Sequence, residues 1–377
     1  MPAAAAARHA SARHTPLLTG ERLEAFGAEL DALREKHVRD LGAADARYIR
    51  RIRHAVRWTE VLGRLAIYGS APAPWLLWPL WIIGTVLLAV SKIIDNMELG
   101  HNVIHGQYDW MNDPSLQGDR FQWDHLCPAD WWRQTHNHSH HQWTNVRGKD
   151  DDIGYGLLRI FPEQRWTPFA LGQPLYAALL AVFYQSGIAL QHLKLGRYLK
   201  GRRSWRHFIA DARPLLRKLP WQGGKDYVFF PLLAGPFFLP VLLANASANL
   251  LRNLWTFVVI FCGHFTADAI TFTPAQVKDE TRAGWYQRQV RGSSNISGGF
   301  PMHLMTGNLS HQIEHHLYPD LPARRYAAMA VEVKAICEKY GVPYNTGSLP
   351  KQFGEVVWRI IRHAFPSRPK WVAATAG

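Results

Sequence analysis

Cysteine is scarce in this chain, and its three copies are scattered along 377 residues. Cys127, Cys262 and Cys337 stand far apart, a spacing that provides neither a disulfide framework nor the paired thiolates of a zinc knuckle. Any metal that the chain binds therefore has other ligands. The first residues also lack the continuous apolar core of a secretory signal. They are expected to form a frayed tail, with a basic transit peptide as the alternative interpretation.

Acidic residues are few beside basic ones. The chain has 43 Lys and Arg against 29 Asp and Glu, a formal net charge of +14, and it contains 16 tryptophans. A basic chain rich in aromatic residues suits an anionic membrane surface. Nucleic acid also attracts positive charge, but no nucleic-acid-binding motif is present, so we expect no such partner. No G-x-G-x-x-G follows a strand either, so no dinucleotide signature is present.

Four apolar stretches invite comparison with a membrane span, which needs about 20 mostly apolar residues. Residues 65–91 form a run of 27 without a formal charge, and residues 227–251 form another of 25. Residues 253–267 follow after a short connection, so these last two runs are expected to form a tight helical hairpin. Residues 168–191 are apolar but interrupted by glycine and proline. Whether residues 53–92 form one span or two is open.

The segment 191–226 is strongly basic, with ten Lys and Arg against two acids. An excess of positive charge in a short loop marks the cytoplasmic side of a membrane. We therefore expect a cytoplasmic loop here. Its ten basic residues are Lys194, Arg197, Lys200, Arg202, Arg203, Arg206, Arg213, Arg217, Lys218 and Lys225.

Histidine is unusually clustered. The stretch "HNVIH" places His101 and His105 on one helix face, because residues four apart lie about 6 Å apart along the axis. The stretches "HNHSHH" and "HQIEHH" each set a polar residue ahead of a histidine pair, and His264 ends the third apolar run. Each group alone also fits an ordinary helix face or polar loop. Three groups in one membrane-type chain indicate shared metal ligation, since polar groups at membrane depth are costly and usually functional.

The number of imidazoles constrains the kind of metal site. Catalytic zinc takes three protein ligands, whereas eight or nine imidazoles suit two ions. Nitrogen ligation without thiolate is compatible with iron, copper or zinc, so the spacing leaves the metal open. A shared site also requires an even number of spans between His141 and His311. Residues 168–191 are therefore expected to lie along the interface, which leaves at most four crossings, with all histidine groups and both termini cytoplasmic.

The stretches "HNVIH", "HNHSHH" and "QIEHH", in this order around a membrane hairpin, resemble the three histidine boxes of the integral-membrane fatty acid desaturases, most closely the bacterial acyl-CoA type. The resemblance covers roughly residues 90–325. It implies a non-haem di-iron centre with two iron ions, which uses O₂ to remove two hydrogens from an acyl chain and leaves a cis double bond. The metal ligands that the resemblance implies are His101, His105, His136, His140, His141, His264, His315 and His316, together with Gln312.

The resemblance also implies partners. The substrate is expected to be a fatty acyl-CoA or an acyl lipid of the bilayer, and the electrons are expected from a separate donor of the ferredoxin or flavin reductase type. The chain lacks the HPGG signature of a fused cytochrome-b-type domain. An unactivated methylene has no acidic proton, so acid–base catalysis does not remove its hydrogens. Oxidation by metal-bound oxygen does, and the protein holds the cofactor and orients the chain.

Several neighbouring residues have more than one candidate role. Gln312 is preferred to His311 in the third box because it precedes the histidine pair by three residues. His138 is expected to be a bystander, since it points about 200° from His136 on an α-helix, whereas His140 shares the face of His136. The other candidates either support the ligands or lie at the surface or membrane interface. They are His125, His303, the acids Asp150, Asp151 and Asp152, and the tryptophans Trp131, Trp132 and Trp143.

Two other functions compete with desaturation. A membrane di-iron hydroxylase of lipid or hydrocarbon uses the same iron chemistry, and the spacing of the histidines does not exclude it. A histidine-lined metal transporter predicts ligands at mid-membrane depth, whereas most of the histidines here lie outside the apolar runs.

The predicted fold class is mainly α, an integral membrane helical protein with a cytoplasmic helical cap that holds the di-metal site, in the bacterial inner membrane. Its expected parts are a tail with amphipathic helices (1–60), transmembrane segments leading into the first box (61–106), a cytoplasmic catalytic segment with the second box (107–226), a transmembrane hairpin (227–270) and a cytoplasmic segment with the third box (271–377).

Overall fold

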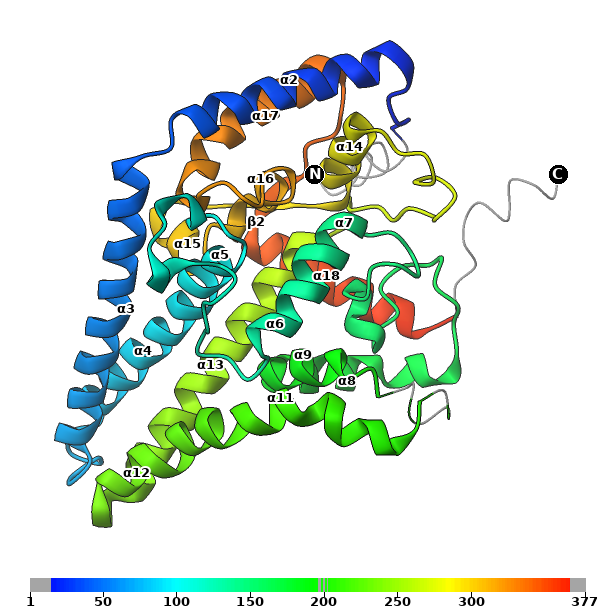
Figure 1. The fold of residues 1–377 in the computed structure, drawn as a ribbon. Helices are drawn as coiled ribbons and strands as arrows, with labels where there is room; N and C mark the ends of the chain where they lie inside the picture. The colour runs from blue at the N-terminus through cyan, green and yellow to red at the C-terminus, as the bar shows by residue number, and fades with distance from the viewer. Residues whose placement is uncertain (1–14, 196–197, 199–200, 202, 367–377) are drawn as a thin grey trace.

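The structure of the protein is a computed structural model, which describes residues 15–366 apart from 196–197, 199–200 and 202 (Figure 1). The predicted N-terminal tail before residue 15 lies outside the described residues, as do Arg197, Lys200 and Arg202 of the basic segment. The described chain is mainly helical, as predicted. Its only sheet within these residues has two short parallel strands, β1 (Asn295–Ser297) and β2 (Thr346–Ser348).

Two long antiparallel helices, α3 (Ala43–Ser70) and α4 (Trp78–Ile94), form one flank of the molecule (Figure 1). Residues 53–92 therefore hold two helices with a turn at 71–77. Gly63 and Gly84 let the two backbones touch, because a Cβ added at Gly63 would lie 2.9 Å from the Gly84 carbonyl oxygen. Small residues permit such close helix contacts. Helix α4 continues through a π-helical turn, η1 (Asp95–Gly100), into α5 (His101–Ile104).

The close contact between α3 and α4 makes Gly63 sensitive to substitution. We expect Gly63→Ala to destabilise the protein by about 1–3 kcal/mol, since overpacking forces the backbones apart. Gly69→Ala, on the same helix, is the matched control, because a Cβ there meets nothing within 4 Å. Thermal unfolding of the two detergent-purified variants measures the difference. Equal midpoints for both would contradict the inferred role of Gly63.

Helix α13 (Phe238–His264) is continuous over 27 residues, so the hairpin predicted within 227–267 is wrong. The stretch "NASANLLRN" contains no helix breaker, and its polar groups have buried partners. Asn245 Nδ2 donates to the Asp226 carbonyl oxygen over 2.9 Å, and Arg252 donates to Gln185. The chain instead turns before α13, at Gly235, whose φ is 54°. That turn, η8 (Gly235–Phe237), follows α12 (Phe230–Leu233).

The basic segment is also more ordered than predicted. It contains α11 (Trp205–Gly224), which leads through the π-helical turn η7 (Lys225–Phe229) into α12. Apolar residues at helical spacing explain this helix, and they remain exposed, as Ile209 at 64% and Trp221 at 71% show. Residues 168–192 form η6 (Pro168–Gly172), α8 (Gln173–Val182) and α9 (Tyr184–His192), each too short to cross a membrane.

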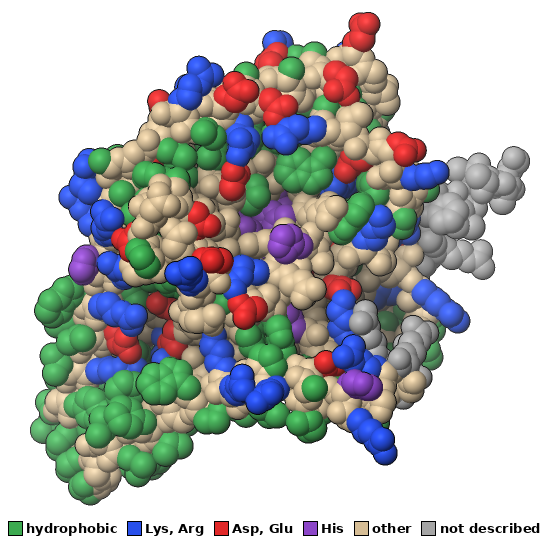
Figure 2. Space-filling view, viewed as in Figure 1, with side chains coloured by type: hydrophobic (Ala, Val, Ile, Leu, Met, Phe, Trp, Pro, Cys, Tyr) green, Lys and Arg blue, Asp and Glu red, His purple; other side chains and the backbone are tan. Residues whose placement is uncertain are grey.

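Apolar side chains cover one end of the molecule. Figure 2 shows them over the α3–α4 turn and α12. Trp75 is 79% exposed there, and Leu233 is 62% exposed. Two helical stretches among the described residues are long and apolar enough to cross a membrane, Trp78–Ile104 and Gly235–His264. Together with α3 and α12, these stretches form the end of the protein that suits a bilayer.

The remaining elements form a cap at the other end, where α2 (Gly20–Arg39) crosses over α17 (Tyr326–Tyr340) (Figure 1). The third box lies on α16, beneath them. The other elements are η2 (Asp109–Met111), η3 (Pro114–Leu116), α6 (Ala129–Trp132), η4 (Arg133–His140), α7 (His141–Trp143), η5 (Ile153–Gly156), α14 (Arg282–Gly292), α15 (Phe300–Met305), η9 (Leu309–His311), α16 (Gln312–Leu317), η10 (Ala323–Arg325) and α18 (Leu349–Ala364).

Candidate metal centre

The histidine boxes and the end of α13 meet inside the protein. Eight histidines, all expected as ligands from the sequence, lie together there. Seven of them form two groups in which every ligand atom is within 4.8 Å of the others. The first group is His101, His105, His136 and His315. The second group is His140, His264 and His316. His141 groups with both His315 and His316 and so lies between the two.

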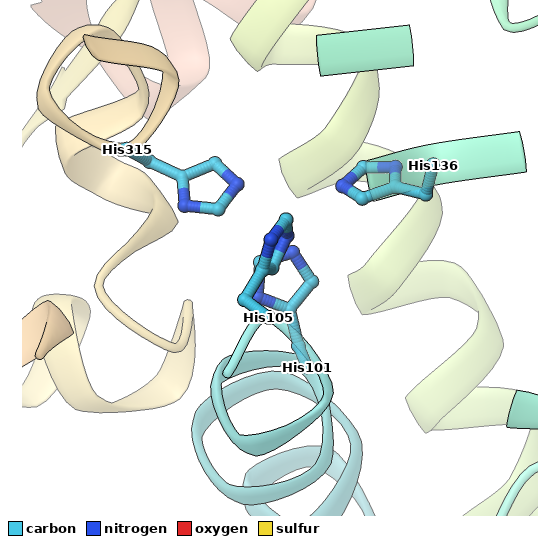
Figure 3. Close-up of side chains that lie close together, drawn as sticks. All are labelled: His101, His105, His136 and His315. Atoms are coloured by element: carbon cyan, nitrogen blue, oxygen red, sulfur yellow. The ribbon is translucent and has the colours of Figure 1, made fainter. Parts of the chain in front are cut away.

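The first group is drawn in Figure 3. His101 and His105 rise from α5, while His136 and His315 approach from opposite sides, and all four rings turn toward one point. The Nε2 atoms of His101, His105 and His315 are buried and have no hydrogen-bond partner in the described chain. A buried polar atom without a partner is costly. A shared cation would satisfy all three.

In the second group, short distances between nitrogens likewise indicate a shared cation. His264 Nε2 lies 3.1 Å from His316 Nε2 and 3.3 Å from His140 Nε2. Two ligands about 2.0–2.1 Å from one ion, at tetrahedral or octahedral angles, are themselves about 2.8–3.4 Å apart. The donor set and its spacing therefore fit a metal ion in each group.

The second box lies on a π-helical turn, which corrects the α-helical geometry expected for it. In η4 the backbone N–H of His141 donates to the carbonyl of His136, five residues earlier. The Nε2 atoms of these two histidines are consequently only 3.3 Å apart, although an α-helix would separate their directions. Such π-helical turns often occur at functional sites.

Comparison with known proteins decides the family. The model of the family described as "Fatty acid desaturase" matches residues 73–348, most of the chain. This chain belongs to the fatty acid desaturase family. A relative from Mycobacterium tuberculosis (strain H37Rv), named "NADPH-dependent stearoyl-CoA 9-desaturase", is 44% identical over 348 residues, which cover 91% of this chain and 80% of the relative. The protein is accordingly an oxidoreductase, a fatty acid desaturase.

More distant relatives share the family but differ in the named reaction. The "sn-1 linoleoyl-lipid 6-desaturase" of Synechocystis sp. (strain PCC 6803) is 26% identical, over 79% of this chain and 81% of that protein. Human "Fatty acid desaturase 3" is 25% identical, over 84% of this chain and 66% of that protein.

Polar groups around the histidines of this desaturase fix the orientation of the rings. His140 Nδ1 donates to Asp150 Oδ1 over 3.1 Å, and His316 Nδ1 donates to Gln289 Oε1 over 3.0 Å. Such partners hold Nδ1 and leave Nε2 free to bind a metal. Three further histidines have the same arrangement, through the Asn102 side chain for His101, the Gly292 carbonyl for His264 and the Tyr326 hydroxyl for His315.

Burial keeps most of these imidazoles neutral, the form that binds metal. Burial, reinforced by neighbouring histidines, lowers the pKa well below its ordinary value for His105, His136, His141, His315 and His316.

His140 differs from the other buried histidines. Burial acts to lower its pKa, but the carboxylates of Asp150 and Asp152 outweigh burial and raise it. Asp150 and Asp152 thus lie against His140. This position suits the first of the two expected roles of the acids, which is to support the metal ligands. Asp151 instead points to the surface and pairs with Lys194 over 2.5 Å.

The third box shows how Gln312 and His311 differ in position. Gln312 Nε2 lies 3.1 Å from His264 Nε2, so its side chain faces the second group of histidines. His311 instead packs against His303, with ring centroids 4.5 Å apart, and belongs to neither group. His138 and His125 also lie outside the two groups. His138 is exposed, and His125 stacks on Trp123.

A cavity runs from the histidines of the desaturase along η1, α9 and α13. Its wall includes Trp132, which stacks on His136 at 4.2 Å and so covers that ring. Trp131 and Trp143 stand apart from the histidine groups, near His192 and Lys149. Other wall residues, such as Tyr155, Tyr184 and Thr256, are far apart along the chain and belong to no motif that could have predicted them.

Proposed function

We propose that this desaturase is an integral membrane enzyme that acts on a saturated acyl-CoA and introduces a cis double bond with O₂ and two iron ions. The observation that carries the proposal is the pair of adjacent histidine groups that line a cavity. His101, His105, His136 and His315 would hold one ion, and His140, His264 and His316 the other, with His141 and Gln312 beside them. When bound, the iron pair supplies the O₂ activation that oxidation of an unactivated methylene requires.

The cavity supports an acyl substrate that enters beside α9. Gln191 and His192 line the cavity and are partly exposed, and Lys194 follows them in the basic segment, which suits the phosphates of CoA. Asn96 on η1 and Thr256 on α13 line the same cavity. The chain would thus pass the histidines, while Trp132 keeps water from the rings.

The depth of the cavity supports a substrate of stearoyl length. Thr256 precedes His264 by eight residues on α13, which is about 12 Å along the helix axis. An extended chain advances about 1.2 Å per bond, so about ten bonds fit between the histidines and Thr256. This length suits the tail of a stearoyl chain beyond carbons 9 and 10. The relative from Mycobacterium tuberculosis carries that substrate and position in its name.

The products of cells that express the enzyme test this function. Gas chromatography of their fatty acids is expected to show a new cis-9 monounsaturated C18 acid that is absent from cells with His315→Ala. A hydroxylated fatty acid in its place would identify the enzyme as a membrane di-iron hydroxylase. An unchanged fatty acid profile, with the iron-loaded protein present and a donor supplied, would contradict the proposal.

We also propose that the electrons come from a separate protein that draws on NADPH. Each O₂ reduced to water takes two electrons from the acyl chain and two from the donor, yet the chain has no dinucleotide signature. The relative is named as NADPH-dependent. Purified desaturase with NADPH, O₂ and stearoyl-CoA is therefore expected to form no product until a ferredoxin or flavin reductase is added. Full turnover without the added protein would contradict this partner.

We place the apolar end of the protein in the bacterial inner membrane and the histidine groups on the cytoplasmic side. The basic segment supports this orientation because its positive charge lies on the same side of the apolar end as the cap. Cysteine labelling in intact cells tests it. Opposite accessibility of positions beside His138 and His311 would contradict a shared site.

A further inference from the structure

Helix α3 carries an unusually dense run of positive charge. Between Arg47 and Arg57 it has five arginines and one histidine, and no acid lies between Asp45 and Glu60. Two of the arginines are held by neighbours, since Arg50 pairs with Asp113 over 3.3 Å and Arg53 donates to the Ser115 hydroxyl.

Two exposed cations in the run are free of such partners. Arg47 and Arg51 form no ion pair or hydrogen bond with any residue in the part of the chain that the structure describes. Arg57 has a side chain that is 69% exposed, and its contact with Glu60 is long, at 3.8 Å. Most of the positive charge on this stretch of α3 is therefore available to an external anion.

The same helix face becomes apolar at Trp58. Exposed residues at helical spacing continue the stripe toward the apolar end, with Trp58 at 65%, Leu62 at 52% and Leu65 at 63%. Figure 2 shows the same change along this flank, from Lys and Arg side chains above to hydrophobic side chains below. Tryptophan is enriched at membrane interfaces, so Trp58 marks the level at which α3 enters the bilayer.

The position of the arginines along α3, relative to Trp58, indicates which anion they bind. The polar layer of one leaflet is about 5–8 Å thick, and Arg57 and Arg51 lie about 1.5 and 10 Å beyond Trp58 along the axis. Both guanidinium groups therefore reach the phosphates of that layer, since long basic side chains extend along a helix toward the interface. An acidic protein would need a patch clear of lipid, whereas this patch continues directly into the apolar surface.

We infer that the α3 arginine patch (Arg51, His54 and Arg57) binds the phosphate groups of anionic phospholipids in the cytoplasmic leaflet. Juxtamembrane clusters of basic residues recognise anionic lipid in this way. The lipid would hold α3 at a fixed depth and, through the Gly63–Gly84 contact, would hold α4, which leads into the first histidine box. The inference rests on the proposed membrane placement and not on the reaction.

Lipid titration of the purified full-length protein tests the inference. In mixed micelles with a fluorescent phosphatidylglycerol tracer, unlabelled phosphatidylglycerol should compete on the order of tenfold better than phosphatidylcholine. The double variant R51Q/R57Q should lose that preference. The matched control R22Q/R39Q removes the same charge from α2, which lies across the cap and away from the apolar end, and should keep it.

Three results would overturn the inference: no preference in the unchanged protein, an undiminished preference in R51Q/R57Q, or an equal loss in R22Q/R39Q. Circular dichroism of each variant shows that it is folded. Extraction by alkaline carbonate without detergent would instead refute the membrane placement itself, and stearoyl-CoA turnover, measured in parallel, reports separately on the proposed reaction.

Discussion

Replacement of His140 by alanine is expected to remove at least one bound iron ion and to abolish the unsaturated product. His140 Nε2 faces His264 and its Nδ1 is fixed by Asp150, so no neighbouring group replaces it. Even loss of an outer partner of a ligand typically costs about 10–100-fold in metal affinity, and loss of the ligand itself costs more. Iron analysis of the purified protein and gas chromatography of the products measure the two effects.

His138→Ala is the matched control within the same box. His138 is exposed and lies outside both histidine groups, so its loss should leave iron content and product unchanged. His141→Ala should behave like His140→Ala, because His141 lies between the two groups. Full activity in His140→Ala, or total iron loss in His138→Ala, would refute the assignment of the second box.

Substitution of Thr256 by tryptophan is expected to shift the preferred substrate from stearoyl to palmitoyl or shorter chains. Thr256 lines the cavity about 12 Å along α13 from His264, where a larger side chain would occupy the space proposed for the last carbons of the tail. Overpacking costs about 1–3 kcal/mol, which corresponds to a change of about 5–150-fold in the ratio of the two turnover efficiencies. Competition between stearoyl-CoA and palmitoyl-CoA in one reaction measures that ratio directly.

The control for Thr256→Trp is Leu250→Trp, on the same helix. Leu250 is 39% exposed and is not part of the cavity wall, so it adds the same bulk outside the substrate path. A chain-length ratio that stays constant in Thr256→Trp would show that the acyl tail ends elsewhere. Equal shifts in both variants would point to a general effect on α13.

The histidine boxes could be predicted because their spacing is local. His101 and His105, or His140 and His141, are recognisable from a few residues of sequence, and the order of the boxes indicates that they share a site. The choice between Gln312 and His311 is different in kind. It depends on the 3₁₀ turn η9, which ends at His311 and places it against His303. The π-helical turn in the second box also has no signature in the sequence.

The membrane-facing helices were harder to predict because their polar residues have distant partners. Asn245, Asn249 and Arg252 looked like a connection between two spans, since an isolated helix would expose them to lipid. In the fold they pack toward Asp226 and Gln185, which lie about 20–70 residues earlier in the chain. The basic segment was predicted to be a loop for the opposite reason. Its many charges outweighed the apolar residues that recur at helical spacing in α11.

The polar residues of α13 have a consequence for how the protein is made. An arginine at the centre of a membrane helix costs about 2.5–3.5 kcal/mol to insert when the helix enters the bilayer alone. The residues that Arg252 and Asn249 bond, namely Gln185 and Asp226, both precede α13 in the chain and are therefore synthesised before it. Helix α13 can therefore enter the membrane beside earlier segments that already carry the partners of its polar residues. The order of the segments along the gene thus fits the order in which their buried polar groups must meet.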